Sequence, residues 1–230
     1  MKKLLLSFLM LIAAVPLWAE YFEFESIRYH ITDAEAKTVA VTTATSTNPY
    51  SGEAVIPAAI TYNGTTYSVT EIEKKAFSES EIVGISVPST ISSIGDYAFR
   101  YCASLKHVAI EDGTTTLTLG SDLFTSSPFE TLYIGRDLYF TNPPFSYNAN
   151  GNNHIVSVEI GSKVTAIPNN LLYNCTNIKS LIVGSGVLSV GTAQSQPIKT
   201  IFLGHTQPTN WTRIKGTKMN YASKQYAPDV

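Results

Sequence analysis

Residues 94–110 read IGDYAFRYCASLKHVAI and contain the pattern on which the fold depends. The second half of this stretch carries three apolar residues with the spacing Φ-x-x-Φ-x-Φ, where Φ is Ile, Leu, Val or Phe: Leu105, Val108 and Ile110. In an extended strand, residues two apart point to the same side, so Val108 and Ile110 are predicted to face inward while Ala109 faces outward. One strand of this kind cannot bury its apolar side alone, which predicts that the same unit recurs along the chain.

The same spacing does recur, six times in all, with successive units starting 20 to 26 residues apart. The units are Ile82/Ile85/Val87, Leu105/Val108/Ile110, Phe129/Leu132/Ile134, Ile155/Val158/Ile160, Ile178/Leu181/Val183 and Ile198/Ile201/Leu203. A second apolar position, aromatic in the first four units, lies upstream of each strand pattern: Phe77, Phe99, Phe124, Phe145, Leu172 and Ala193. A period of about 20 to 29 residues with one short apolar strand per unit is typical of a leucine-rich solenoid, in which stacked units bury one core.

Two more segments share the pattern of residues 94–110, namely IEKKAF at 72–77 and, with substitutions, IPNNLLYNCTNI at 167–178. These segments resemble the repeat of the BspA-type leucine-rich family, and the resemblance covers roughly residues 69–204. It implies a mostly β fold with short turns or helical pieces, arranged as a leucine-rich repeat solenoid of about six units of 20–26 residues behind a small antiparallel β cap. It also implies a secreted or surface-associated bacterial protein that works in adhesion and protein binding.

Residues 20–68 follow a different pattern, with strand-like alternation and the pair Asn63-Gly64 between two apolar runs. Asn-Gly tolerates the positive φ angles of a two-residue type I′ turn, which predicts a β-hairpin. Because the open first strand of a solenoid would recruit other chains, residues 20–68 are interpreted as an N-terminal β cap over that edge. The solenoid is predicted over residues 69–204, and a polar C-terminal cap or tail over residues 205–230.

Residues 1–19 have the basic start, short apolar core and small final residue of a secretory signal peptide, which predicts cleavage after Ala19. The apolar run, residues 4–15, is shorter than the roughly 20 residues of a membrane span, and no transmembrane segment is expected in the mature chain. The protein is therefore expected to be exported: secreted, periplasmic or associated with the cell surface. Loss of residues 1–19 changes the formal net charge from −2 to −4, which argues against a nucleic-acid partner.

The sequence contains no recognisable catalytic, nucleotide-binding or metal-binding motif, which predicts no enzyme, no cofactor and no metal. The histidines are scattered without a close ligand pair: His30, His107, His154 and His205. Cys102 and Cys175 occupy equivalent positions in units two and five, three residues before the strand pattern. Three repeats at ~4.8 Å per strand separate them by roughly 14 Å, beyond the ~7 Å limit for a disulfide, so two buried thiols are predicted.

The outward positions of the predicted strands gain apolar bulk toward the C-terminal half of the solenoid. The candidate partner-binding face has four residues: Tyr133, Glu159, Ile182 and Phe202. Contiguous apolar exposure usually marks a contact surface; alternatively, the C-terminal aromatic residues fold over this face: Trp211, Tyr221 and Tyr226. Six strands give a face on the order of 300 Å², well below the roughly 800 Å² that each partner buries in a stable interface, so weak or multivalent binding is expected.

Three functions are compatible with this pattern. The first is a non-enzymatic recognition module that adheres to a host matrix or cell-surface protein through the solenoid face. The second is a glycan-binding module, because exposed aromatic residues such as Tyr133 and Phe202 can lie against sugar rings. The third is a structural spacer in the cell envelope, whose outward face would be inert.

Overall fold

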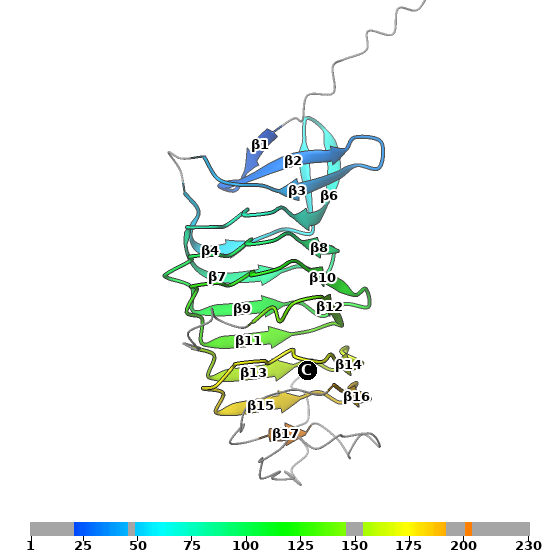
Figure 1. Ribbon diagram of the computed structural model, residues 1–230. Helices are drawn as coiled ribbons and strands as arrows, with labels where there is room; N and C mark the ends of the chain where they lie inside the picture. Colours follow the sequence, from blue (N-terminus) through cyan, green and yellow to red (C-terminus); the bar gives the residue numbers. More distant parts are fainter. Residues whose placement is uncertain (1–20, 46–48, 146–153, 192–200, 204–230) are drawn as a thin grey trace, which may run out of the picture.

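The computed structural model describes residues 21–45, 49–145, 154–191 and 201–203. These residues form strands and turns without any helix. The chain winds through successive coils that stack into an elongated solenoid, with the N-terminal strands at one end (Figure 1). The segments expected as short turns or helical pieces are turns.

One side of the solenoid is a parallel sheet of seven strands in the order β4-β7-β9-β11-β13-β15-β17. Six of them coincide with the six predicted units: β7 (Glu81–Val87), β9 (His107–Ile110), β11 (Thr131–Ile134), β13 (Ser157–Ile160), β15 (Ser180–Val183) and β17 (Ile201–Leu203). Their pairing also follows the predicted equivalences, since Val108 lies opposite Ile85 on one neighbour and Leu132 on the other. The repeat and its register are therefore confirmed.

The seventh strand, β4 (Ser51–Val55), pairs in parallel with β7, although its segment was expected to belong to an antiparallel cap. A register shift between Gly52 and Glu53 marks a bulge, and Gly52 has a φ of 71°. The bulge displaces the side-chain alternation, so this strand does not show the spacing of the other six. The solenoid sheet thus begins one coil earlier than the sequence pattern indicates.

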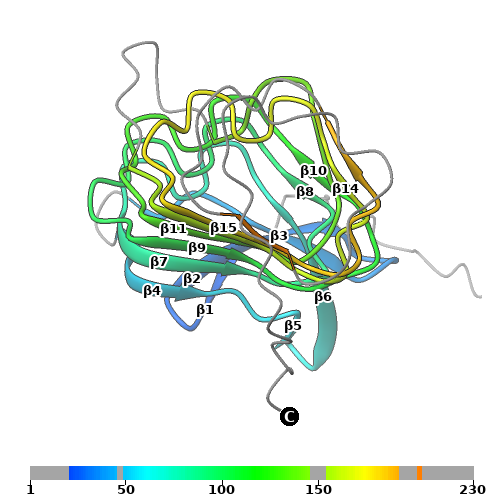
Figure 2. The ribbon, with the colours of Figure 1, turned by 90° about the horizontal axis from the view of Figure 1, so that it is seen from below.

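A second side of each coil carries a shorter strand. β8 (Ser93–Ile94), β10 (Leu117–Leu119) and β12 (Leu138–Phe140) continue one sheet, while β14 (Ala166–Ile167) and β16 (Ser189–Val190) form a separate pair. Along the stack, β8, β10 and β14 lie on a different side from β7, β9 and β11 (Figure 2). Where the ladder breaks between β12 and β14, the Asp137 carboxylate accepts the backbone N–H groups of Thr165 and Ala166 at 2.7 and 3.1 Å. A side chain therefore satisfies backbone donors that a strand would otherwise pair.

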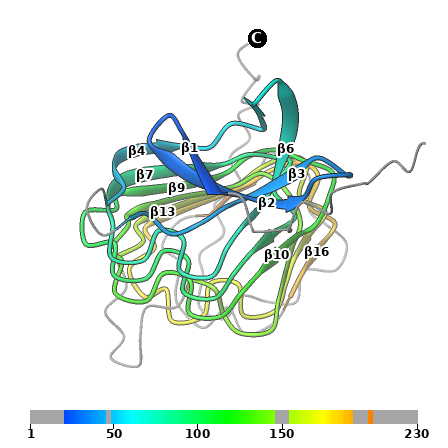
Figure 3. The ribbon, with the colours of Figure 1, turned by 90° about the horizontal axis from the view of Figure 1, so that it is seen from above.

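The N-terminal cap consists mainly of antiparallel strands: β1 (Tyr21–Phe24), β2 (Ile27–Asp33), β3 (Thr38–Val41), and the hairpin of β5 (Ala59–Tyr62) with β6 (Thr65–Ile72). In the hairpin turn, Asn63 and Gly64 have φ angles of 49° and 77°, as the predicted turn requires. Viewed from the N-terminal end, β1, β2 and β3 lie across the first coils (Figure 3). β6 pairs with β3 along one edge and with β8 near its end, so it joins the cap to the solenoid.

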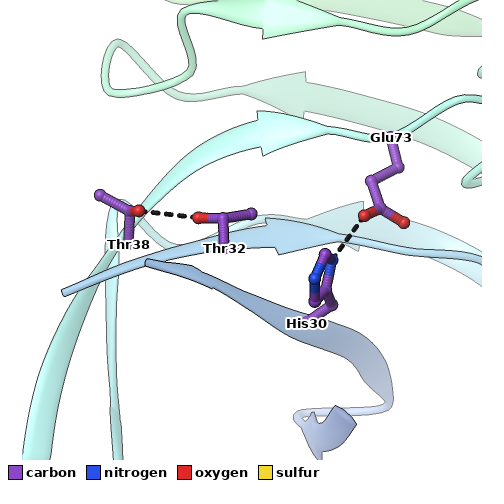
Figure 4. A network of polar contacts seen from close by, with 4 residues as sticks. All are labelled: His30, Thr32, Thr38 and Glu73. Atoms are coloured by element: carbon purple, nitrogen blue, oxygen red, sulfur yellow. Dashed lines mark hydrogen bonds and ion pairs between the residues drawn. The ribbon is translucent and has the colours of Figure 1, made fainter. Parts of the chain in front are cut away.

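Polar contacts add a little to the stability of the cap. His30 Nδ1 on β2 lies 2.6 Å from Glu73 Oε1, just beyond β6, and Thr32 Oγ1 lies 2.7 Å from Thr38 Oγ1 (Figure 4). Partly exposed contacts of this kind contribute about 0–1 kcal/mol each. The cap is therefore held mainly by buried side chains such as Tyr29, which is inaccessible to solvent.

A ladder of aromatic rings runs through the interior along the stack: Tyr50, Phe77, Phe99, Phe124 and Phe145. Consecutive ring centroids lie 4.8, 5.4, 5.1 and 5.8 Å apart, and every ring is buried. These distances lie in the range that offset-stacked and tilted aromatic pairs prefer. The four aromatic residues predicted upstream of the strands are thus buried in the core, and Tyr50 extends their ladder toward the cap.

Three phenylalanines of the ladder and the equivalent leucine lie in turns that share an unusual backbone: Phe77, Phe99, Phe124 and Leu172. Four turns contain two residues of positive φ four positions apart: Lys75/Glu79, Tyr97/Tyr101, Asp122/Ser126 and Asn170/Asn174. Left-handed backbone is unfavourable for residues other than glycine. Hydrogen bonds between adjacent turns offset this cost, for example from Phe77 N–H to Ala98 O at 2.8 Å and from Phe99 N–H to Leu123 O at 3.0 Å.

Both cysteines are buried thiols, as predicted. The Cys102 thiol donates to Phe77 O at 3.0 Å and also contacts Ser80 Oγ at 3.4 Å. Burial raises the pKa of Cys102, so the reactive thiolate is disfavoured at neutral pH. Cys102 therefore serves packing between coils.

The aromatic ladder makes a first prediction about stability. Phe99→Ala should lower the free energy of unfolding by about 3–5 kcal/mol, because it removes a buried ring between two neighbours and leaves a cavity. Urea unfolding followed by circular dichroism measures this change. Tyr139→Ala is the control, since Tyr139 is 60 % exposed; a similar loss in both variants would contradict the central role of the ladder.

The glycines provide a second prediction. A Cβ atom at Gly120 would lie 2.5 Å from Asp96 N, a backbone atom that cannot move easily, whereas at Gly84 it would lie 2.0 Å from the end of the His107 side chain. Gly120→Ala should therefore destabilise the protein by about 1–3 kcal/mol. Gly84→Ala should cost clearly less, because His107 can rotate away. Thermal unfolding of both variants checks the order, and a larger loss at Gly84 would refute it.

Candidate recognition face

The outward side of the seven-stranded sheet presents one continuous row of residues, here called the outward row. Strand register places its members opposite one another: Val55, Ser86, Ala109, Tyr133, Glu159, Ile182 and Phe202. The four residues of the candidate partner-binding face are consecutive members of this row. The structure thus brings together positions that lie up to 69 residues apart in the sequence.

The members of the outward row differ in exposure. Glu159 is exposed, Ile182 keeps 38 % of its surface exposed, and Tyr133 is half-buried. For Phe202 the structure describes the backbone pairing with Ile182, but not the side chain. The predicted cover of this face by residues 205–230 lies outside the described residues.

Tyr133 is oriented by a hydrogen bond to a loop that follows the neighbouring strand. Its hydroxyl donates to Asp112 Oδ1 at 2.5 Å. Gly161 leaves room for this arrangement, since a Cβ atom there would lie 2.6 Å from Tyr133 Oη. Burial, the bond to Asp112 and the negative charges of Asp112 and Glu159 all raise the pKa of Tyr133. Tyr133 is therefore a protonated donor across the neutral pH range.

Acidic side chains accompany the apolar part of the row. Glu111 accepts a hydrogen bond from Ser86 Oγ at 2.9 Å, Asp112 holds Tyr133, and Glu159 stands exposed beside it. Three carboxylates next to exposed aliphatic and aromatic surface favour a partner with basic and apolar groups. Glu159 is predicted by its place in the repeat, whereas Glu111 and Asp112 lie in a loop outside the repeat and were not predicted.

Near the N-terminal end of the sheet, a histidine and a carboxylate from the strands on either side of β7 contact each other. His107 Nε2 lies 2.9 Å from Glu53 Oε2, above Gly84, which is buried beneath the two side chains. Gly84 and His107 lie opposite each other on β7 and β9, while Glu53 lies on β4, the strand that the pattern did not reveal. Both side chains are about half exposed, so this pair contributes little to stability.

The described part of the chain holds neither a cluster of metal ligands nor a membrane-spanning helix. No three His, Cys, Asp or Glu side chains gather there as metal ligands. Those residues also include no helix of the length and apolarity that a membrane span requires. The absence of catalysis remains a prediction from the sequence.

Stacked parallel coils with one short apolar strand per repeat define a solenoid of the leucine-rich repeat class. The repeat pattern described as "BspA type Leucine rich repeat region" matches residues 70–199 in six copies, which is more than half of the chain. The protein belongs to this family. A search of curated protein sequences found no match.

Several solved structures are similar to this chain. A leucine rich cell surface protein from Faecalibacterium prausnitzii A2-165 has a TM-score of 0.51 and 21 % identity, covering 80 % of this chain and 48 % of its own. A leucine-rich repeat protein from Bacteroides capillosus ATCC 29799 has a TM-score of 0.36 and 20 % identity, with coverage of 80 % and 97 %. The T. pallidum leucine rich repeat protein has a TM-score of 0.45 and 14 % identity, with coverage of 80 % and 86 %. The chain spans about half the length of the F. prausnitzii protein, and the likeness concerns the fold.

A third prediction concerns the orientation of Tyr133. Asp112→Asn should lower the pKa of Tyr133 toward its ordinary value of about 10, because the substitution removes the charge of the acceptor. Burial persists, so part of the increase should remain. Nuclear magnetic resonance of ¹³C-labelled tyrosine measures this pKa, and an unchanged titration in Asp112→Asn would contradict the contact.

The same raised pKa has a consequence for stability. A pKa that is higher in the folded state stabilises the fold fully below the unfolded value of about 10, and this contribution is lost as the pH rises through the folded pKa. The wild type should therefore lose stability above about pH 10 more steeply than Tyr133→Phe. Tyr29 and Tyr50, whose pKa values burial also raises, affect both proteins alike.

Proposed function

We propose that this chain is a non-enzymatic recognition module of an exported bacterial protein, and that it adheres to a host matrix or cell-surface protein through the outward row. The observation that carries this proposal is the register of Tyr133, Glu159 and Ile182, which lie opposite one another on β11, β13 and β15. Phe202 on β17 extends the same line. Residues at one height on adjacent strands stand close enough to present one continuous surface to a partner.

Export to the cell surface is supported by two observations of different kinds. Residues 1–19 have the composition of a secretory signal peptide. The F. prausnitzii protein with the same fold is described as a cell surface protein. A surface location would give the outward row access to proteins outside the cell.

The size of the face determines how strongly it can bind. Seven strands about 4.8 Å apart, with about four residues of strand each, span on the order of 400 Å². A stable interface buries roughly 800 Å² on each partner. Binding through the sheet alone is therefore weak, and firm adhesion requires several copies or additional contacts.

The test compares binding of the mature protein, residues 20–230, in monomeric and multimeric form to immobilised matrix and cell-surface proteins. The Tyr133→Ala/Ile182→Ala variant should bind at least about tenfold more weakly, because it removes the apolar centre of the row. Glu159→Lys should weaken binding to a basic partner and reverse the effect of salt. Biolayer interferometry measures both changes.

Leu188→Ala is the matched control, because Leu188 is 68 % exposed but lies outside the outward row. It should bind as the wild type does. Binding that survives the double substitution would refute the outward row as the site. No binding to any protein of the panel, even in multimeric form, would favour the structural envelope spacer.

A further inference from the structure

The turns of the first coils form a second surface that the outward row does not include. A cavity of about 300 Å³ opens between the N-terminal cap and the first coil. Hydroxyl groups and one charge of each sign line it: Thr43, Thr45, Ser78, Ser80, Lys75 and Glu79. Such a lining can donate and accept many hydrogen bonds, so it suits a ligand rich in hydroxyl groups.

The next coil adds aromatic faces and positive charge. The Arg100 guanidinium lies 4.3 Å from the ring centroid of Tyr101 and 5.3 Å from that of Tyr97. Lys74 Nζ lies 5.7 Å from the Tyr97 ring, and Arg100 Nη2 donates to Tyr101 Oη at 2.6 Å. Significant cation–aromatic contacts occur roughly once per 70–80 residues, so three contacts around two tyrosines are a local concentration.

The cavity and the aromatic cluster adjoin. Lys75 N–H donates to Asp96 O at 3.0 Å, which places Lys75 beside Tyr97 on the next coil. Glu79 N–H donates to Arg100 O at 2.8 Å. The two sets of residues are therefore one coil spacing, about 4.8 Å, apart and can contact a single ligand.

The cations at this surface have no acidic partner among the described residues. In the described part of the chain, Lys74, Lys75 and Arg100 form no ion pair, since the two that occur join His30 to Glu73 and His107 to Glu53. Arg100 Nε is also buried without a hydrogen-bond partner. Four acidic groups belong to these turns: Glu73, which pairs with His30, Asp96, which accepts from Ser121 N–H at 2.8 Å, Glu79 in the cavity lining and Asp122 one coil farther along. Two of the four carboxylates are thus already bonded, whereas none of the three cations is in an ion pair with a described residue, and cations without a partner favour an anionic ligand.

We infer that this surface, here called the turn site, binds an acidic saccharide, a pyranose that carries a carboxylate. Its members are Lys74, Lys75, Ser78, Glu79, Tyr97, Arg100 and Tyr101. The C–H face of the sugar packs on Tyr101, which is 42 % exposed. The sugar hydroxyls bond to the cavity lining, and the carboxylate pairs with Arg100 or the lysines. The turn site lies on a different side of the coils from the outward row, so it does not depend on the proposed function.

The test uses acidic and neutral probes that differ only in charge or in one acidic sugar. Tetragalacturonate is compared with its methyl ester, and 3′-sialyllactose with lactose, by calorimetric titration of the mature protein. At least one acidic probe should bind saturably. The affinity of its neutral counterpart should be lower by a factor of about ten or more. Arg100→Gln and Tyr101→Ala should each weaken acidic binding by a similar factor, whereas Arg100→Lys should retain part of it.

Tyr173→Ala is the matched control, because Tyr173 is 40 % exposed and occupies in a later turn the position that corresponds to Arg100. Tyr173→Ala and Tyr133→Ala should both bind as the wild type does. The proposal is overturned if neither acidic probe binds, if neutral and acidic probes bind equally, or if Tyr173→Ala loses binding to the same extent. Thermal unfolding monitors folding, and the Arg100 variants decide the outcome if Tyr101→Ala is unstable.

Discussion

The spacing of about 4.8 Å between neighbouring coils is the constraint on which the rest of the structure depends. At this distance, an inward side chain packs directly on the same position of the next coil, so Phe77, Phe99 and Phe124 stack ring on ring. Where two backbones meet at a corner, no Cβ atom fits, and glycine occupies positions such as Gly95 and Gly120. Outward positions are not subject to this constraint, because their side chains face solvent.

The same constraint explains how much of the fold the sequence predicts. Because the period is strict, each unit predicts one strand in an equivalent position. Six strands and their register therefore follow from one spacing. β4 was not predicted from the repeat, because a bulge at Gly52 breaks the alternation of its side chains. The second-side strands, such as β8 with only two residues, are too short to show any period. Hairpin formation at Asn63-Gly64 is predicted by local backbone chemistry alone.

The candidate site, too, was predicted only in part. Register alone aligns Tyr133 with Glu159 and Ile182, and this alignment follows from the repeat. The contact that orients Tyr133 comes from Asp112, a loop residue outside any period, and therefore could not be predicted. This contact also bears on the glycan hypothesis, because a half-buried, hydrogen-bonded Tyr133 offers less ring surface to a sugar than the exposed Tyr101 does.

Shape further separates the two surfaces. A sheet face of several strands suits a large partner that can cover many residues, whereas the cavity beside Lys75 and Glu79 suits a small one. Because the turn site and the outward row lie on different sides of the coils, both can be occupied at once. Each contact is weak by itself, but a saccharide and a protein carried on the same surface would bind with the effective concentration of linked sites. The proposed adhesion then requires no single interface of standard size.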